Sequence, residues 1–106
     1  MNGFAKIIKR TISTDSEGFK TETDEVLAAV RCFHEERHSS YRWANLAAFS
    51  QATDRFVIRK NPHYEVKIGY FIDCDNVRYK ILSVENVKSR NMYLDIYAER
   101  AVPVLG

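Results

Sequence analysis

The sequence predicts a mainly β domain, a small antiparallel, partly closed barrel or sandwich of about six strands, with one short helix in the connection between strands 2 and 3. Three observations predict this class. The 106 residues suffice for one hydrophobic core and not for two, so residues 1–106 are expected to form a single domain. Short runs rich in β-branched residues alternate apolar with polar side chains, as strands do. A parallel sheet would require strands and helices to alternate along the chain, and in this sequence they do not.

Composition and charge exclude several classes of protein. Hydrophobic residues make up 45% and charged residues 28% of the chain, which is typical of folded soluble domains. The net charge of +2 is too small to indicate nucleic-acid binding by itself. Apolar runs such as residues 26–30 are far too short to cross a bilayer, so no membrane is expected as a partner. Cys32 and Cys74 lack CxxC spacing, and we expect both to be reduced and at least half-buried.

The first two strands are predicted at residues 4–12 and 21–32. The first run carries β-branched residues with partial alternation, and a polar segment that includes Asp15 separates it from the second in the manner of a turn. Alternate positions of the second strand form a cleanly apolar face. The residues expected on that face are Val26, Ala28, Val30 and Cys32.

The alternation disappears after the second strand, where a short helix is predicted at residues 41–49. Ser39 or Ser40 suits the cap of this helix, because a serine hydroxyl accepts a hydrogen bond from the first turn. The residues that recur at four-residue spacing are Trp43 with Ala47 and Ala44 with Ala48. The preceding residues, 34–38, are polar throughout and are expected to form a loop.

Four more strands are predicted at residues 54–60, 66–74, 77–84 and 92–99. Proline at position 62 ends the first of them, because proline cannot continue a sheet ladder. Asp75-Asn76 joins the middle two in a tight hairpin, since short polar side chains tolerate positive φ. The apolar positions that alternate with polar ones are Phe56 and Ile58, then Met92, Leu94, Ile96 and Ala98. The tail from about residue 100 is expected to be loose.

Several segments together resemble a known family in their order and spacing. They are the strands at residues 5–14 and 21–32, the helix at 41–49, Phe56-Val57-Ile58-Arg59, Tyr79-Lys80-Ile81 with Val84, and residues 91–96. This order resembles the phage head-to-tail joining family, which includes the head-closure or stopper proteins of long-tailed phages. Relatives often have glycine in the hairpin turn, where this chain has Asp75-Asn76. Asparagine adopts the same left-handed conformation.

The resemblance implies a structural virion protein and not an enzyme. Subunits of this kind form a homo-oligomeric ring, while the isolated chain could be a monomer. The ring joins the portal or adaptor protein of the head to a tail protein, and packaged double-stranded DNA passes through its lumen. It would lie in the virion, and in the host cytoplasm during assembly. The resemblance implies no cofactor and no metal.

Candidate contact residues fall in two places. The long connection at residues 33–50 is expected to carry function, because long insertions between strands usually do. Its candidates for partner or lumen contact are His34, Arg37, His38, Tyr41, Arg42 and Trp43. On the polar face of the last strand, Tyr93 and Tyr97 are candidates for a subunit interface, where tyrosine is enriched.

Residues 34–38 also match HExxH, the motif of zinc metallopeptidases. That chemistry needs one helix through both histidines, so that they bind the metal from one face, and a third ligand nearby. Glu36 and Arg37 precede Ser39-Ser40, so a helix is expected to begin after the motif. No third ligand stands at a recognisable spacing. We therefore interpret the motif as a solvated polar loop.

Two further functions stay open at this point. Cys32 and His34 would share one face of a strand, as a cysteine nucleophile and its base require, but no orienting third group is visible. A nucleic-acid-binding small β-barrel would bind DNA or RNA as a monomer in a salt-dependent way. The basic residues that such a barrel could use are Arg55, Arg59, Lys60, Arg78 and Lys80.

Overall fold

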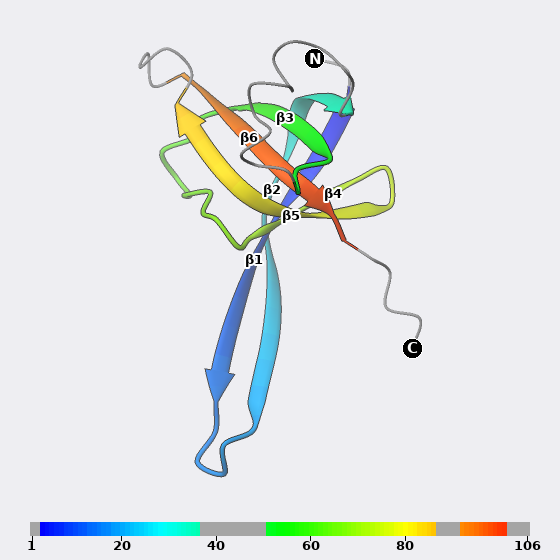
Figure 1. The fold of residues 1–106 in the computed structure, drawn as a ribbon. Helices are drawn as coiled ribbons and strands as arrows, with labels where there is room; N and C mark the ends of the chain where they lie inside the picture. The colour runs from blue at the N-terminus through cyan, green and yellow to red at the C-terminus, as the bar shows by residue number, and fades with distance from the viewer. Residues whose placement is uncertain (1–2, 37–50, 87–91, 102–106) are drawn as a thin grey trace.

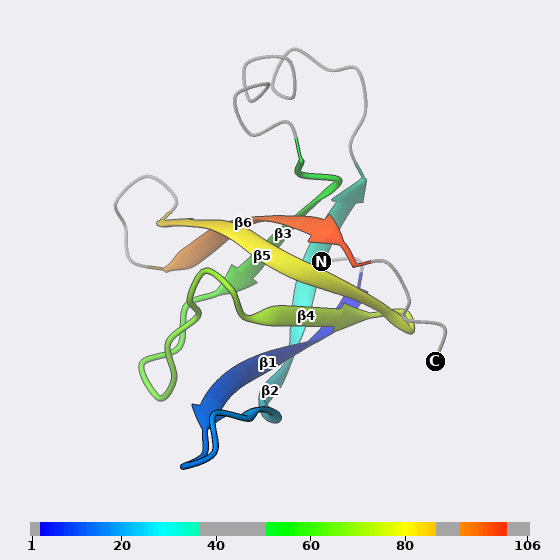
Figure 2. The same cartoon turned by 60° about the horizontal axis from the view of Figure 1, so that its bottom comes forward.

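The computed structural model describes residues 3–36, 51–86 and 92–101, and its strands close into an antiparallel barrel (Figure 1). In chain order they are β1 (Gly3–Thr14), β2 (Lys20–Glu36), β3 (Asp54–Arg59), β4 (Phe71–Cys74), β5 (Val77–Asn86) and β6 (Tyr93–Arg100). Around the barrel the order is β1-β2-β3-β6-β5-β4, and β4 pairs back onto β1. Figure 2 shows β4 lying between β5 and β1. The predicted mainly β, barrel-like class is confirmed.

Inward-facing side chains of all six strands fill the barrel, because successive strand residues point to opposite faces. Phe56 and Ile58 of β3 are fully buried, as predicted, and so are Ile96 and Ala98 of β6. The rest of the core consists of Ala5, Ile7, Cys32, Val66, Ile72, Cys74, Tyr79, Ile81 and Leu94. Closure into a barrel pairs the strand edges around this core, which protects them from edge-to-edge aggregation.

Beyond the barrel, β1 and β2 continue as a projecting two-stranded arm, which Figure 1 shows in blue. We define the arm as residues 9–25. β1 pairs with β4 only at residues 6–8, and β2 pairs with β3 only at residues 32–36. Within the arm, β1 and β2 therefore pair with each other and with no other described strand. At its tip the Asp15 carboxylate accepts hydrogen bonds of 2.9 Å from the backbone N–H groups of Glu17 and Phe19.

A β-bulge marks the junction between the barrel and the arm. Ile7 pairs with Ala28, but Ile8 pairs with Val26, which leaves Leu27 as an extra residue in β2. One extra residue reverses the alternation of side chains that follow it. Leu27 therefore packs against the core, while Val26 is 58% exposed. The prediction that Val26 lies on the apolar face with Cys32 is wrong for this reason.

Two predicted boundaries also differ. β2 runs to Glu36 because His34, Glu35 and Glu36 pair with β3, so the loop predicted from His34 is wrong for residues 34–36. β4 begins at Phe71 and not at residue 66, because Gly69 has a φ of 93° and interrupts the strand. The hairpin prediction is confirmed, with φ of 51° at Asp75 and 65° at Asn76.

Some predictions fall outside the described residues. These are the helix at 41–49 and the tail beyond residue 101. The single-domain prediction likewise stays a prediction. Among the residues that the structure describes, none forms a helix long and apolar enough to span a membrane.

Candidate functional site

A cluster of polar side chains lies inside one end of the barrel, centred on His34 of β2. Its Nε2 atom is 2.5 Å from Oδ2 of Asp54, at the start of β3. The other oxygen of Asp54 accepts a hydrogen bond of 2.7 Å from the Thr53 hydroxyl, which in turn accepts one of 2.8 Å from the Arg100 backbone N–H. Asp54 is 1% exposed, and no other charged side chain among the described residues is buried. These bonds offset the cost of its burial.

Two aromatic rings fix the orientation of the His34 imidazole. The ring stacks on Phe56 with centroids 4.4 Å apart and planes 5° from parallel. Tyr79 meets it edge-on, at a centroid distance of 5.6 Å. Burial raises the pKa of the Tyr79 phenol, so the hydroxyl stays neutral at physiological pH. His34 is therefore held between a carboxylate and two rings, with 17% of its side chain exposed.

Both cysteines lie next to this cluster, on either side of β1. A Cβ atom added to Gly3 would lie 3.4 Å from Sγ of Cys32 and 3.9 Å from Sγ of Cys74. Burial raises the pKa of Cys32 to about 12, and the neighbouring Cys74 adds to the effect. Burial also raises the pKa of Cys74. The reactive species is the thiolate, so these shifts disfavour the cysteine-nucleophile alternative.

The HExxH alternative is contradicted by the backbone. His34, Glu35 and Glu36 belong to β2, and their side chains point alternately inward and outward. Outside the barrel, the Glu35 carboxylate is 3.5 Å from the Arg55 guanidinium. A zinc peptidase needs a helix from the first histidine onward, and a strand cannot put the motif's histidines on one helical face.

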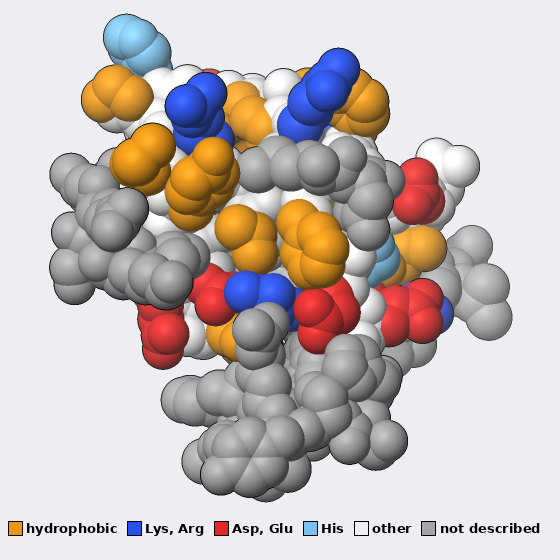
Figure 3. Space-filling view, turned by 90° about the horizontal axis from the view of Figure 1, so that it is seen from above, with side chains coloured by type: hydrophobic (Ala, Val, Ile, Leu, Met, Phe, Trp, Pro, Cys, Tyr) orange, Lys and Arg blue, Asp and Glu red, His pale blue; other side chains and the backbone are white. Residues whose placement is uncertain are grey.

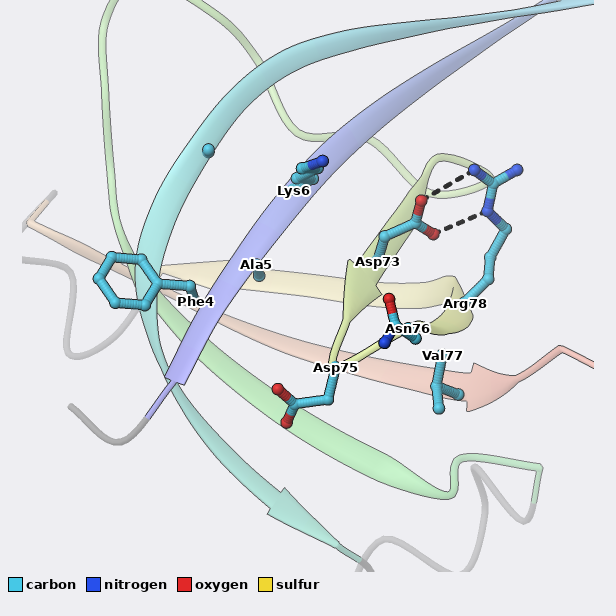
Figure 4. A pocket seen from close by; sticks show the side chains of 9 residues that line it. Phe4, Ala5, Lys6, Asp73, Asp75, Asn76, Val77 and Arg78 are labelled. Atoms are coloured by element: carbon cyan, nitrogen blue, oxygen red, sulfur yellow. Dashed lines mark hydrogen bonds and ion pairs between the residues drawn. The ribbon is translucent and has the colours of Figure 1, made fainter.

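A hollow of about 560 Å³ lies on the outer side of the hairpin between β4 and β5 (Figure 4). Asp73 and Arg78 form part of its wall through two hydrogen bonds of 2.7 and 2.9 Å. Asp75, on the hairpin turn, points away from this pair (Figure 4). It thus stands on the rim between the hollow and the cluster inside the barrel.

Two of the three arginines that a nucleic-acid-binding barrel would use, Arg55 and Arg78, are instead engaged by carboxylates. Arg78 also donates a hydrogen bond of 2.8 Å to Asp24, and Arg55 donates one of 2.7 Å to Asp95. Figure 3 shows the same mixing on one face, where Lys and Arg side chains lie beside Asp and Glu rather than in one continuous basic patch. This pattern does not favour the nucleic-acid alternative, which calls for a clustered basic face.

The structure separates the predicted contact residues into three groups. His34 lies in the inner cluster and not in a loop. Tyr93, at the start of β6, is partly buried, whereas Tyr97 is only 6% exposed and packs with Ala52 and Leu82. Tyr97 therefore offers little surface to another subunit. The candidates that lie outside the described residues are Arg37, His38, Tyr41, Arg42 and Trp43.

Sequence reasoning missed Asp54, although a signal for it was present. Asp54 precedes Phe56 and Ile58 by two and four residues, so it occupies the same inward face of β3. A carboxylate at such a position must be paired, which makes it a candidate member of a polar cluster. Cys74 and Asp75 carried no comparable signal, because they reach His34 through closure of the barrel.

The barrel, its arm and the internally bonded polar cluster together define a small β-barrel domain with a projecting arm. The model of the phage head completion protein family matches residues 1–101, and the chain belongs to this family. This confirms the resemblance to the phage head-joining family, and the protein is a phage head structural protein.

A solved structure shows the same fold. A chain from the virion of a native gene transfer agent (GTA) particle superposes with a TM-score of 0.62 at 16% identity, covering 96% of each chain. No curated protein matches the sequence. Membership of a structural family supports the expectation that the chain is not an enzyme.

Proposed function

We propose that this protein is a head-closure subunit, whose copies form a ring that joins the portal or adaptor of the head to the tail. Packaged double-stranded DNA passes through the lumen of that ring. The subunit waits in the host cytoplasm during assembly and ends in the virion. Family membership over residues 1–101 supports the head-completion role, and the arm is the observation that supports the ring.

The arm has features of a surface that another subunit covers. Beyond the barrel, the outer edges of β1 and β2 pair with no described strand, and such edges are templates for a further strand. Ile12, Phe19 and Val26 are all more than half exposed on or beside it. In a ring each arm would lie against the next subunit in a head-to-tail contact, which closes when the rotation between neighbours allows.

The base of the arm is fixed to the barrel by charge. Asp24 on the arm bonds both Arg10, at 2.9 Å, and Arg78 of β5, at 2.8 Å. The two guanidinium groups also lie over the ring of Phe71, at 4.2 and 5.5 Å from its centroid. These contacts hold the arm at a defined angle to the barrel, as a repeated ring contact requires.

A particle-joining assay tests the proposal. Phage lacking this protein would be complemented with Phe19→Ser or Ile12→Ser, and joined, DNA-retaining particles would be counted by electron microscopy and infectivity. We expect each variant to reduce joining at least tenfold, because the arm contact recurs around the whole ring. Ile68→Ser is the matched control, since Ile68 is an exposed isoleucine in the turn before β4 and not on the arm.

Two outcomes would overturn the proposal. One is normal joining by both arm variants while they remain folded. The other is tight, salt-dependent DNA binding by the isolated monomer, which would favour the nucleic-acid-binding barrel. A subunit interface at Tyr93, to which the mostly buried Tyr97 would add little surface, remains a proposal that the same assay can examine. Partner contacts by residues 34–43 are a further proposal of this kind.

A further inference from the structure

Three side chains of types that bind metals lie close together at the end of the barrel that holds the His34 cluster. One ligand atom each from His34, Cys74 and Asp75 lies within 4.8 Å of the other two. His34 belongs to β2, while Cys74 and Asp75 end β4 and begin the hairpin turn. These strands flank β1 on opposite sides, so closure of the barrel creates this group.

We propose that this group binds one zinc ion, through a ring nitrogen of His34, the thiolate of Cys74 and the carboxylate of Asp75. Nitrogen, sulfur and oxygen donors in one group are characteristic of zinc among the common divalent metals. Zinc–ligand bonds of about 2.0–2.3 Å put the donor atoms of a tetrahedral site roughly 3.5 Å apart. The described atoms lie within 4.8 Å of one another and need to approach by up to about 1.3 Å to reach that spacing. Asp75 is exposed on a turn where it has room to move.

The carboxylate behind His34 is an independent observation that favours the same site. Histidines that bind zinc commonly place their second ring nitrogen against a carboxylate, which fixes the ring and strengthens the ligand. Asp54 has this position, with Oδ2 at 2.5 Å from Nε2 of His34. The metal would then be held by Nδ1, with the ring already oriented by its stacking on Phe56.

Zinc would replace the proton of the Cys74 thiol. The Cys74 thiol points to Oδ2 of Asp75, at 3.9 Å. When zinc binds, the thiol proton leaves to solvent and both atoms coordinate the metal, so that the thiolate and the carboxylate balance the two positive charges. A water molecule completes the four ligands. The bound ion ties β2 to the β4–β5 hairpin at one end of the barrel.

Metal binding by the isolated chain tests the proposal. Chelator-treated protein in reducing buffer would be titrated with Zn²⁺ against a chromophoric chelator, and with Co²⁺ to detect thiolate absorption. We expect one ion per chain and a rise in Tm of at least about 5 °C at a tenfold excess of zinc over its Kd. Cys74→Ser and Asp75→Asn should each weaken binding at least tenfold. Asp75→Asn should fold, because asparagine accepts the φ of 51° at this position.

Two matched control substitutions test whether the loss of zinc binding is specific to the proposed ligands. Cys32→Ser alters the neighbouring buried cysteine, which is not a member of the group of mutually close donors, and should leave affinity within about threefold. His63→Ala alters an exposed histidine outside the group and should have no effect. The proposal would be wrong if the chain bound no stoichiometric metal, or if Cys32→Ser and Cys74→Ser weakened zinc binding equally. Because the assay uses the isolated chain, its failure would leave the ring function untouched.

Discussion

The barrel and the arm are built from the same two strands but are stabilised by different interactions. In the barrel half of β1, Ala5, Ile7 and Ile8 are buried in the core. In the arm half, residues 11–14 are all exposed. Burying an isoleucine side chain contributes about 1.5–3 kcal/mol, whereas a cross-strand pair on an exposed ribbon contributes only about 0.2–1 kcal/mol. The arm can therefore vary in sequence without unfolding the barrel.

The largest expected difference in stability comes from shortening a phenylalanine in each region. Phe56→Ala should lower the free energy of unfolding by about 3–5 kcal/mol, because it leaves a cavity in the core. Phe19→Ala, at an exposed site on the arm's turn, should change it by less than about 0.5 kcal/mol. Urea denaturation followed by circular dichroism measures both. Equal losses would mean that the arm is part of the cooperative core.

The buried polar cluster should be the next most sensitive feature of the barrel. Asp54→Ala leaves His34 and Thr53 without their carboxylate partner, so we expect a loss of about 2–4 kcal/mol. The control is Glu65→Ala, since Glu65 forms an exposed pair with Lys67 at 3.9 Å and should contribute under about 0.5 kcal/mol. A loss at Asp54 no larger than this control would contradict a structural role for the cluster. Thermal denaturation at neutral pH measures the difference.

Two glycines with positive φ compare backbone strain in the two regions. Gly69 of the barrel has a φ of 93°, and Gly18 at the arm's tip has a φ of 86°, with nothing near either added Cβ. Gly69→Ala should cost about 1–2 kcal/mol of global stability. Gly18→Ala should cost under about 0.5 kcal/mol globally, because the tip relieves strain by local fraying, and amide exchange should rise there instead. Equal global costs would show that the arm unfolds only with the barrel.

The smallest expected effect is the pH dependence of the arm's base. The hydrogen bond from Arg10 is the main cause that lowers the pKa of Asp24 from its ordinary value of 3.8. Asp24 therefore stabilises the folded state above about pH 4 and loses this contribution as pH falls through its lowered pKa. The two side chains are 26% and 33% exposed and solvent screens their charges, so the effect should stay below about 1 kcal/mol. Asp24→Asn should flatten stability between pH 5 and pH 2.5, and an unchanged slope would contradict this assignment.

Local periodicity explains what the sequence could predict. Phe56 and Ile58, or Ile96 and Ala98, alternate with polar residues within one strand, so their burial could be predicted without knowing the fold. The Asp75-Asn76 turn is likewise local. Family order and spacing then pointed to the phage joining proteins, which the family match bears out.

What could not be predicted depends on how distant strands pair. Similar β-branched residues occur in both halves of β1, the one in the arm and the one in the barrel. Nothing local therefore indicates where the pairing of β1 with β4 ends. The single extra residue at Leu27 is a matter of register with β1. The meeting of His34 with Cys74 and Asp75 requires the β1–β4 pairing that closes the barrel. Each of these features is long-range, and single-sequence patterns carry no such information.

The bulge at Leu27 has a consequence for how these proteins evolve. It lies where the barrel ends and the arm begins, and the pairs on either side of it are Ile7 with Ala28 and Ile8 with Val26. Losing one codon there would keep these pairs and the two faces of the arm, but it would remove the local kink and extra twist that a bulge gives. In the proposed ring, this loss would change the direction in which the arm meets its neighbour in one genetic step. The core and the side chains of the arm would stay as they are.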